Sequence, residues 1–399
     1  MTEFAARARA ALADKGVSIR GAARALNYNP SYVSRVLNGK QLPSPKLAQG
    51  LDQLVGADGV LVALASCDAR PEGVPSDASW DVGPGSDDDL EALELARRVE
   101  ASDVGPETLD RLEEAFDGLA VAYQTHRPSA LLRDVRRHSA YVTKLLDERK
   151  TLGEHRRLLV IGGWLSLLGA TLHVDLKEGG AATARLRTAT LLAEHAGHAE
   201  IRAWVYETKA WTALTAGDYP RAVQLSQAAQ SIAPRGGSVT VQATAQEGRA
   251  RARLGERAEA YSAIDRVQHL ASTMVMRARP EHHYQYDPDK ATSYTATTLA
   301  WIGDPAAEAP AREVIGHLAP GVAPSTWPRR VVTAHLDLAL TLLSLNRLDE
   351  ATDAALKAIS SGRLLPANHW RVLEIVRAVE ARRLPEAPEL RESYEQLRP

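Results

Sequence analysis

The chain has 399 residues, 45% of them hydrophobic, which is enough for two or three domains with buried cores. Its single cysteine, Cys67, excludes an intramolecular disulfide and a cysteine-based metal site within one chain. We therefore expect a cytoplasmic protein, and charged residues recur through the first 14 positions, unlike a secretory signal. Because glycines interrupt the most apolar stretch, residues 158–174, we expect no membrane span.

The formal net charge of −2 hides an uneven distribution along the chain. Residues 1–65 carry eight Lys or Arg against four Asp or Glu, a net charge of +4, whereas residues 66–91 carry eight acids and only Arg70, a net charge of −7. A basic segment on a nearly neutral chain is typical of a module that binds nucleic acid. Residues 66–88 are rich in Gly, Pro, Ser and Asp. We expect an acidic flexible linker there, a solvated tether more readily than a competitor of phosphate for the basic segment.

Two short helices joined by a tight turn are predicted within residues 18–39. Ser18 is a suitable N-cap for the first helix, and Asn27 tolerates the positive φ that the turn requires. Asn29 caps the second helix, and Pro30 takes its first position, where a missing N–H costs nothing. A purely structural helical hairpin is the alternative. It would not explain why polar side chains occupy the outward positions of the second helix.

This spacing resembles the lambda-repressor-like (XRE) helix-turn-helix family over roughly residues 2–65, with a leading helix at 2–15 and a trailing helix at 45–54. Asn27 replaces the usual turn glycine, and Pro30 stands where relatives often carry a base-reading side chain. The resemblance implies that residues 30–37 enter the major groove of DNA. It places base contacts on Ser31, Tyr32 and Arg35, and phosphate contacts on Arg20, Asn29, Asn38 and Lys40.

From residue 89 onward the sequence predicts helices and almost no strands, so we expect an all-α protein. Residues 89–152 are predicted to form a helical connecting region, with helices at 88–101, 106–125 and 128–152. Residues 153–399 contain a recurring pattern. After Gly217, small residues follow at five and twelve positions, and Pro234 follows at seventeen. This spacing matches the tetratricopeptide (TPR) repeat.

Copies of the pattern predict a C-terminal TPR-like α-solenoid. They are centred on Gly255 (with Ala260), Asn346 (with Ala351 and Ala358), Gly179 (with Ala184) and Gly303, where Glu308 replaces the small residue. One hairpin cannot bury its apolar face alone, so the hairpins must stack, and the stack has a concave inner face. Residues 366–399 are expected to form the terminal capping pair.

The first helix of each hairpin is expected to line this inner face and to bind an extended peptide or a small molecule. Aromatic, amide, hydroxyl and charged residues fall there: Trp204, Glu207, Trp211, Gln242, Gln246, Arg249, Lys290, Ser293, Tyr294 and Thr297. The amides would bond a peptide backbone, and Arg249 or Lys290 would meet a carboxylate. The alternative is ordinary packing. Trp204 and Trp211 are more typical of hairpin core than of a ligand platform.

Residues 277–290 interrupt the repeat and are expected to form either a lid or a dimer contact. Their His282, His283, Asp287 and Asp289 do not make a convincing metal site, because adjacent histidine side chains diverge. We find no glycine-rich phosphate loop, nucleophile elbow or His-Glu-x-x-His helix. The sequence therefore predicts no catalytic residue, no cofactor and no enzyme.

The combined plan is similar to that of bacterial, actinobacterial-type XRE/TPR regulators and of the peptide-sensing RRNPP regulators. The resemblance implies a sequence-specific transcriptional regulator that binds double-stranded DNA at an inverted repeat as a homodimer. A peptide or small-molecule signal in the repeat domain would control it. The alternative is a TPR interaction scaffold that its helix-turn-helix head localises to DNA.

Overall fold

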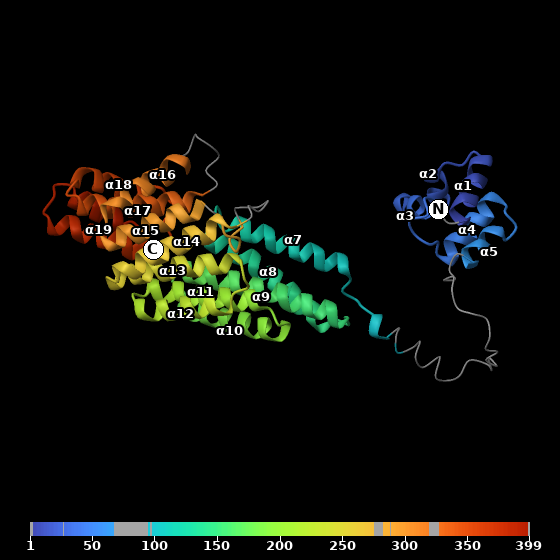
Figure 1. Ribbon diagram of the computed structural model, residues 1–399, viewed down its shortest axis with the longest axis horizontal. Helices are drawn as coiled ribbons and strands as arrows, with labels where there is room; N and C mark the ends of the chain where they lie inside the picture. Colours follow the sequence, from blue (N-terminus) through green and yellow to red (C-terminus); the bar gives the residue numbers. More distant parts are fainter. Residues whose placement is uncertain are drawn as a thin grey trace. The chain divides into compact units, whose positions relative to one another are not determined.

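The computed structural model describes residues 3–26, 28–67, 95, 98–274, 282–287, 289–318 and 327–397. The chain forms two compact units, residues 1–86 and residues 87–399 (Figure 1). Every regular element within the described residues is a helix, which confirms the predicted all-α class. Most of the predicted linker and of the predicted helix at 88–101, together with Asn27, lies outside the described residues.

The N-terminal unit packs five helices around one apolar core that includes Phe4, Val33, Val36 and Leu37. The helices are α1 (Glu3–Asp14), α2 (Ile19–Ala25), α3 (Pro30–Leu37), α4 (Pro45–Val55) and α5 (Val60–Cys67). The first four agree with the prediction to within one residue at most ends. The sequence analysis missed α5, because its eight residues are apolar nearly all round and give no amphipathic stripe. Cys67, expected in the linker, is the last residue of α5.

Local hydrogen bonds position α2 and α3 as predicted. The Ser18 hydroxyl accepts a hydrogen bond from the Gly21 amide at 3.1 Å and caps α2. The Asn29 side chain accepts one from the Ser31 amide at 2.9 Å and caps α3. Gly39 ends α3 with φ +69°, a conformation that glycine adopts at no steric cost. The sequence thus determines both ends of α3.

The C-terminal unit is a solenoid of antiparallel helical hairpins (Figure 1). Its elements are α7 (Pro106–Ala122), α8 (Pro128–Asp147), α9 (Leu152–Asp175), α10 (Gly179–Ala196), α11 (Ala199–Thr215), α12 (Tyr219–Ile232), α13 (Ser238–Leu254), α14 (Arg257–Ser272), α15 (Asp289–Ile302), η1 (Pro305–Ala307), α16 (Glu308–Leu318), α17 (Pro328–Ser344), α18 (Leu348–Ser360), η2 (Pro366–Asn368), α19 (His369–Ala381) and α20 (Ala387–Glu395). Helices α9, α11, α13, α15, α17 and α19 each pack on the next and form a continuous inner layer. The terminal pair predicted within residues 366–399 is α19 and α20.

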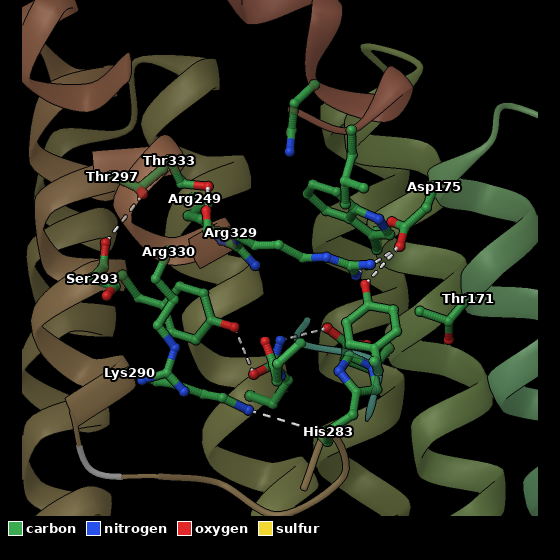
Figure 2. A pocket seen from close by; sticks show the side chains of 18 of the residues that line it. Thr171, Asp175, Arg249, His283, Lys290, Ser293, Thr297, Arg329, Arg330 and Thr333 are labelled. Carbon is green, nitrogen blue, oxygen red and sulfur yellow. Dashed lines mark hydrogen bonds and ion pairs between the residues drawn. The ribbon is translucent and has the colours of Figure 1, made fainter. Parts of the chain in front are cut away.

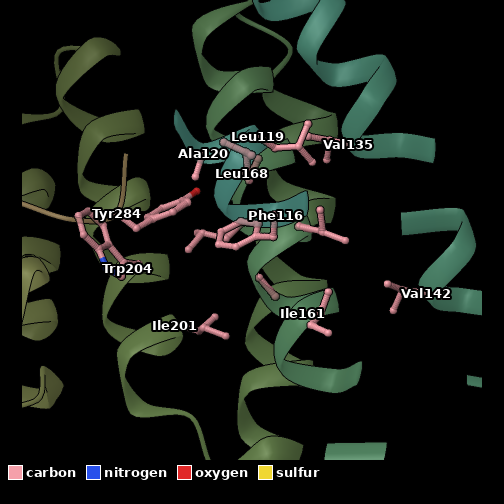
Figure 3. Packing of buried hydrophobic residues seen from close by; sticks show 14 of the residues in the cluster. Phe116, Leu119, Ala120, Val135, Val142, Ile161, Leu168, Ile201, Trp204 and Tyr284 are labelled. Atoms are coloured by element: carbon pink, nitrogen blue, oxygen red, sulfur yellow. The ribbon is translucent and has the colours of Figure 1, made fainter. Parts of the chain in front are cut away.

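Helix α8 ends at Asp147, five residues before the predicted end. Thr151 starts α9 with a capping box: its hydroxyl accepts from the Glu154 amide at 3.2 Å, and its own amide donates to the Glu154 carboxylate at 2.8 Å. Helices α7 and α8 share one apolar core with α9 and α11, seen in Figure 3 around Phe116, Leu168 and Trp204. The described part of the predicted connecting region is therefore continuous with the repeats.

The predicted turns have the expected backbone conformation at four of the five copies. Positive φ angles of +82°, +76°, +72° and +59° occur at Gly217, Gly255, Gly303 and Asn346. At the fifth copy the prediction was wrong by two residues, because Lys177 adopts the left-handed conformation, with φ +62°, and Gly179 is the first residue of α10. The buried small residues are consequently Ala182 and Ala189, which are 1% and 0% exposed, whereas the predicted Ala184 is exposed.

Helix α9 is the one helix within the described residues that is long and apolar enough to cross a membrane, and 89% of its most apolar stretch is buried inside the protein. Two adjacent glycines let it approach its neighbours. A Cβ atom on Gly162 would lie 3.2 Å from Leu192, and one on Gly163 would lie 3.1 Å from Ile201. Both distances are shorter than most real Cβ contacts, so a larger residue at either position would press on its neighbour in this close-packed core.

Candidate functional sites

The outward face of α3 carries the residues predicted to contact bases. Ser31 and Arg35 are exposed, and the Arg35 Nε atom donates a hydrogen bond to the Gln41 side chain at 3.2 Å. Tyr32 is only half-exposed: its hydroxyl accepts from the Ser44 amide at 3.2 Å, and its ring lies 5.8 Å from that of Tyr28. Tyr32 thus ties α3 to the start of α4, while its O–H can still donate to another group. Base contact by these three residues stays a prediction.

The residues predicted to contact phosphate lie around the ends of α2 and α3. Arg20, Asn29, Asn38 and Lys40 are all exposed. The carbonyl oxygen of the Asn38 side chain accepts from Arg9 Nη1 at 3.0 Å, so α1 brings a further cation to this surface. The sequence analysis did not single out Arg9, because nothing local connects residues 29 positions apart. A phosphate would meet Arg9 and Asn38 together.

The inner layer of the C-terminal unit encloses a cavity of about 180 Å³ (Figure 2). Its walls come from α9, α11, α13, α15, α17 and α19, with further residues from the end of α7 and from the segment 282–287. Eight of the ten predicted ligand residues line it: Glu207, Trp211, Gln242, Arg249, Lys290, Ser293, Tyr294 and Thr297. The repeat register therefore brings these eight side chains together. A ligand on them stays a prediction.

Trp204 and Gln246, the other two predicted ligand residues, do not line the cavity. Trp204 is 1% exposed and packs edge-on against Tyr284, with ring centroids 5.1 Å apart (Figure 3). Gln246 is fully buried and accepts a hydrogen bond from Arg249. Both belong to the faces of α11 and α13 that pack into the protein. For Trp204 the alternative of hairpin core holds.

The described part of the predicted insertion is mostly buried. Tyr284 and Tyr286 are among the core residues, and His283 lines the cavity, with its ring centroid 4.1 Å from that of Tyr123. The segment 282–287 therefore packs into the protein and contributes His283 to the cavity wall. His282 Nε2 lies 3.2 Å from an oxygen of Asp117. Among the described residues no group of three or more His, Cys, Asp or Glu could hold a metal ion.

Several cavity residues escaped the sequence analysis: Tyr123, Gln124, Thr171, Asp175, Thr208, His283, Trp301, Arg329, Arg330, Thr333, Leu365, Asn368 and Arg371. Many come from helices outside the three repeats that were considered. One signal was available, since Arg329 and Arg330 open α17, and cations are unfavourable at a helix N-terminus. In the structure, Asp175 and Asp287 lie beside the two arginines and offset that cost.

Three of the cavity arginines have carboxylate partners. Arg329 lies 3.5 Å from Asp175, Arg330 lies 2.6 Å from Asp287, and Arg371 donates to Asp337. Arg249 and Lys290 have no carboxylate within ion-pair distance in the described part of the chain. Arg249 lies against the Tyr294 ring, 4.4 Å from its centroid, and Lys290 donates at 3.4 Å to the carbonyls of His283 and Gln285.

The pKa values in the cavity shift as expected for a site with little water. Burial, and next the charge of Arg330, lower the pKa of Lys290 to about 7. Burial, and next Lys290, lower the pKa of His283, so this histidine is neutral at pH 7. Burial raises the pKa of Glu207, although the Gln242 amide donates to it at 3.1 Å. Burial in the cavity thus favours the neutral form of each of these three groups.

Some of the buried polar atoms that have no hydrogen-bond partner among the described residues belong to this cavity. They include Ser293 Oγ, Arg249 Nε, Arg330 Nη2 and Trp301 Nε1, all on residues that line it. Native proteins leave few such atoms unpaired, because each costs free energy. The arrangement is chemically suited to binding a polar molecule.

Comparison with known proteins identifies the N-terminal unit. Residues 3–65 match the family model described as "Helix-turn-helix domain". Comparisons with curated proteins and with solved structures gave no match. The N-terminal unit is therefore a helix-turn-helix domain, and this class of domain indicates a DNA-binding regulator.

Proposed function

We propose that the protein is a sequence-specific transcriptional regulator whose helical-repeat unit binds a signal and joins two chains into a homodimer. The observation that carries the proposal is the presence, in one chain, of a helix-turn-helix domain and of a cavity with unpartnered polar groups. A regulator needs both parts, one to read DNA and one to report a condition. Its place of action would be the cytoplasm.

DNA recognition is assigned to α3. Its exposed face would lie in the major groove, with Ser31 and Arg35 toward the base edges. Arg35 would release Gln41 and make a bidentate contact to guanine, worth about 1–3 kcal/mol of discrimination. Tyr32 would keep α3 on α4 and donate its O–H to the DNA. Arg20, Asn29, Asn38 and Lys40 would fix the register on phosphates.

Signal binding would act through the shape of the solenoid. Its inner helices all contribute to the cavity, so a ligand that draws their side chains together favours one curvature. In a homodimer, that curvature sets the separation of the two helix-turn-helix domains. Half-sites in an inverted repeat lie about 34–36 Å apart, so a change of a few ångströms alters DNA affinity.

The test is to identify the DNA that the full chain selects. Purified protein is incubated with fragments of the genome that encodes it, and bound fragments are sequenced. We expect a shared inverted repeat, and native mass spectrometry should find two chains on one such duplex. Recovery of all fragments in proportion to their abundance would contradict the proposal. One chain per duplex with a stoichiometric partner protein would instead support an interaction scaffold.

A further inference from the structure

The charges at the cavity do not balance. Five cationic side chains line it, Arg249, Lys290, Arg329, Arg330 and Arg371. Three of them, Arg329, Arg330 and Arg371, each form an ion pair with an aspartate. Two of those aspartates, Asp287 and Asp337, do not line the cavity themselves. Arg249 and Lys290 are left with one carboxylate, Glu207, which interacts with both of them without forming an ion pair with either. With Lys290 protonated, the cavity therefore holds an excess of one positive charge, or of two when Glu207 is also protonated.

This excess is costly because both cations are buried. Arg249 and Lys290 are 8% and 6% exposed, and a buried cation that lacks a partner destabilises the folded chain. Among the described residues, Lys290 Nζ has two long hydrogen bonds, both to backbone carbonyls, and Arg249 Nε has none. An anion in the cavity would offset the charge and satisfy these donors. A cationic ligand would add to the excess.

The size of the cavity suits a small molecule. An apolar protein cavity of about 150 Å³ holds one benzene molecule. The cavity here measures about 180 Å³, which suits one ring with a polar group. An extended peptide of several residues would need a much longer groove. Aromatic side chains, among them Trp211 and Tyr294, line the cavity and provide apolar surface for a ring.

We propose that this cavity binds a small ring-containing organic anion, a carboxylate or a phosphate monoester, with Arg249 and Lys290 as its charge partners and Ser293 as a hydrogen-bond donor. The inference rests on the proposed function in treating the cavity as the signal site. It goes further in naming the chemical class of the signal. On binding, Lys290 would exchange its bonds to the carbonyls of His283, seen in Figure 2, and of Gln285 for the anion.

The experiment compares anionic probes with neutral ones of the same shape. Thermal unfolding of the full chain is followed with 10 mM benzoate or benzamide, and with phenyl phosphate or phenol, at constant ionic strength. We expect benzoate, phenyl phosphate or both to raise the melting temperature by about 2–4 °C, and the matched neutral compounds to leave it unchanged. The anion that gives the larger increase in melting temperature indicates whether the natural signal carries a carboxylate or a phosphate.

Substitutions then locate the binding site. K290M and R249Q should each raise, at least tenfold, the anion concentration needed for the same increase in melting temperature. K357M, which removes an exposed lysine paired with Asp353, should leave it unchanged. Removing the buried charge should also raise the melting temperature of ligand-free K290M. Should one variant fail to fold by circular dichroism, the other gives the same test.

Three outcomes would overturn the anion assignment: no response to either anion, equal responses to the neutral compounds, or full responses in both K290M and R249Q. DNA binding, measured in the same samples, separates this inference from the proposed function. An anion response with unchanged DNA affinity would support the anion site and contradict its role as the signal site. DNA affinity that changes only with a neutral compound would support a signal role for small-molecule binding and contradict the anion as the signal.

Discussion

Arg329 joins the two ends of the helical-repeat unit: its Nη2 atom donates to the backbone carbonyl of His126 at 2.8 Å, across 203 positions in the chain. Arg363 makes the same kind of contact to the carbonyl of Thr125, also at 2.8 Å. Both carbonyls follow the end of α7, whereas Arg329 lies at the start of α17 and Arg363 lies between α18 and η2. The last hairpins therefore contact the first, and the cavity lies between them.

Loss of these two contacts should loosen the ends of the solenoid. In the R329A/R363A double variant, we expect amide hydrogen exchange at residues 123–126 to accelerate at least tenfold. The two lost hydrogen bonds should lower the free energy of local opening by about 1.4 kcal/mol or more, and about 1.4 kcal/mol corresponds to a tenfold change in the exchange rate. The control is R377A, which removes an exposed arginine from α19. Exchange at residues 123–126 that stays at the wild-type rate would show that the contacts do not hold the ends together.

Arg35 and Lys40 should affect DNA binding in different ways. R35A should weaken binding to the selected inverted repeat by about 1–3 kcal/mol and leave random DNA nearly unaffected, because the lost contact is to a base. K40A should weaken binding to the inverted repeat and to random DNA similarly, because the lost contact is to a phosphate. It should also reduce by about one the slope of log binding constant against log salt concentration. Fluorescence anisotropy at several salt concentrations measures both effects. Equal losses on both DNAs for both variants would refute the assignment.

Tyr32 should contribute to the stability of the helix-turn-helix domain. Y32F removes the acceptor of the Ser44 amide and should cost about 1 kcal/mol, seen as faster hydrogen exchange at residues 44–48 of the full chain. Y28F is the matched control, since the Tyr28 hydroxyl makes no hydrogen bond within the part of the chain that the structure describes, and its ring lies beside that of Tyr32. Similar exchange in Y32F and Y28F would mean that the Ser44 bond adds nothing.

Local sequence signals predicted much of the fold. The caps at Ser18 and Asn29 and the turns at Gly217 and Asn346 involve residues within a few positions of one another, and the structure has each of them. The error at Gly179 has a similarly local cause. Lysine rarely adopts positive φ, so the sequence favoured a nearby glycine over Lys177 as the turn residue.

The composition of the cavity was only partly predictable. Counting back from repeat turns located Glu207, Arg249 and Lys290, because the register of a hairpin fixes its inner face. The same counting could not find Arg329 or its partner Asp175, which lie 154 positions apart and meet only because the solenoid brings its ends together. Long-range closure of this kind leaves no periodic pattern in the sequence.

Asp337 should be essential for the stability of the C-terminal unit. It is 1% exposed and accepts hydrogen bonds from Arg371 and, at 2.6 Å, from Thr297. D337A would leave the Arg371 charge buried and unpaired, so we expect it to lower the free energy of unfolding by about 3–5 kcal/mol. The D337A/R371M double variant should recover part of this loss. Urea unfolding measures it, and a double variant less stable than D337A alone would contradict the argument.

Lys290 should make the stability of the ligand-free protein depend on pH. Its folded pKa of about 7 lies below the ordinary lysine value of 10.5, so between these limits the unfolded chain binds more protons than the folded one. Stability contributed by this group therefore rises with pH above 7, by at most about 1.4 kcal/mol per pH unit, and its cost is fully present below pH 7.

The charged and titratable groups that face Lys290 are Arg330, Asp287, Glu207 and His283, and all of them remain in K290M. Urea unfolding at pH 7, 8 and 9 should give a steeper rise for wild type than for K290M, and K357M should follow wild type. The anion response should change in the opposite direction, because a neutral amine offers no charge to benzoate. It should fall in wild type as pH rises from 7 to 9. A slope shared by wild type and K290M would mean that Lys290 stays protonated in the folded protein up to pH 9, so that burial does not lower its pKa. An anion response that persists at pH 9 would leave Arg249 as the main charge partner.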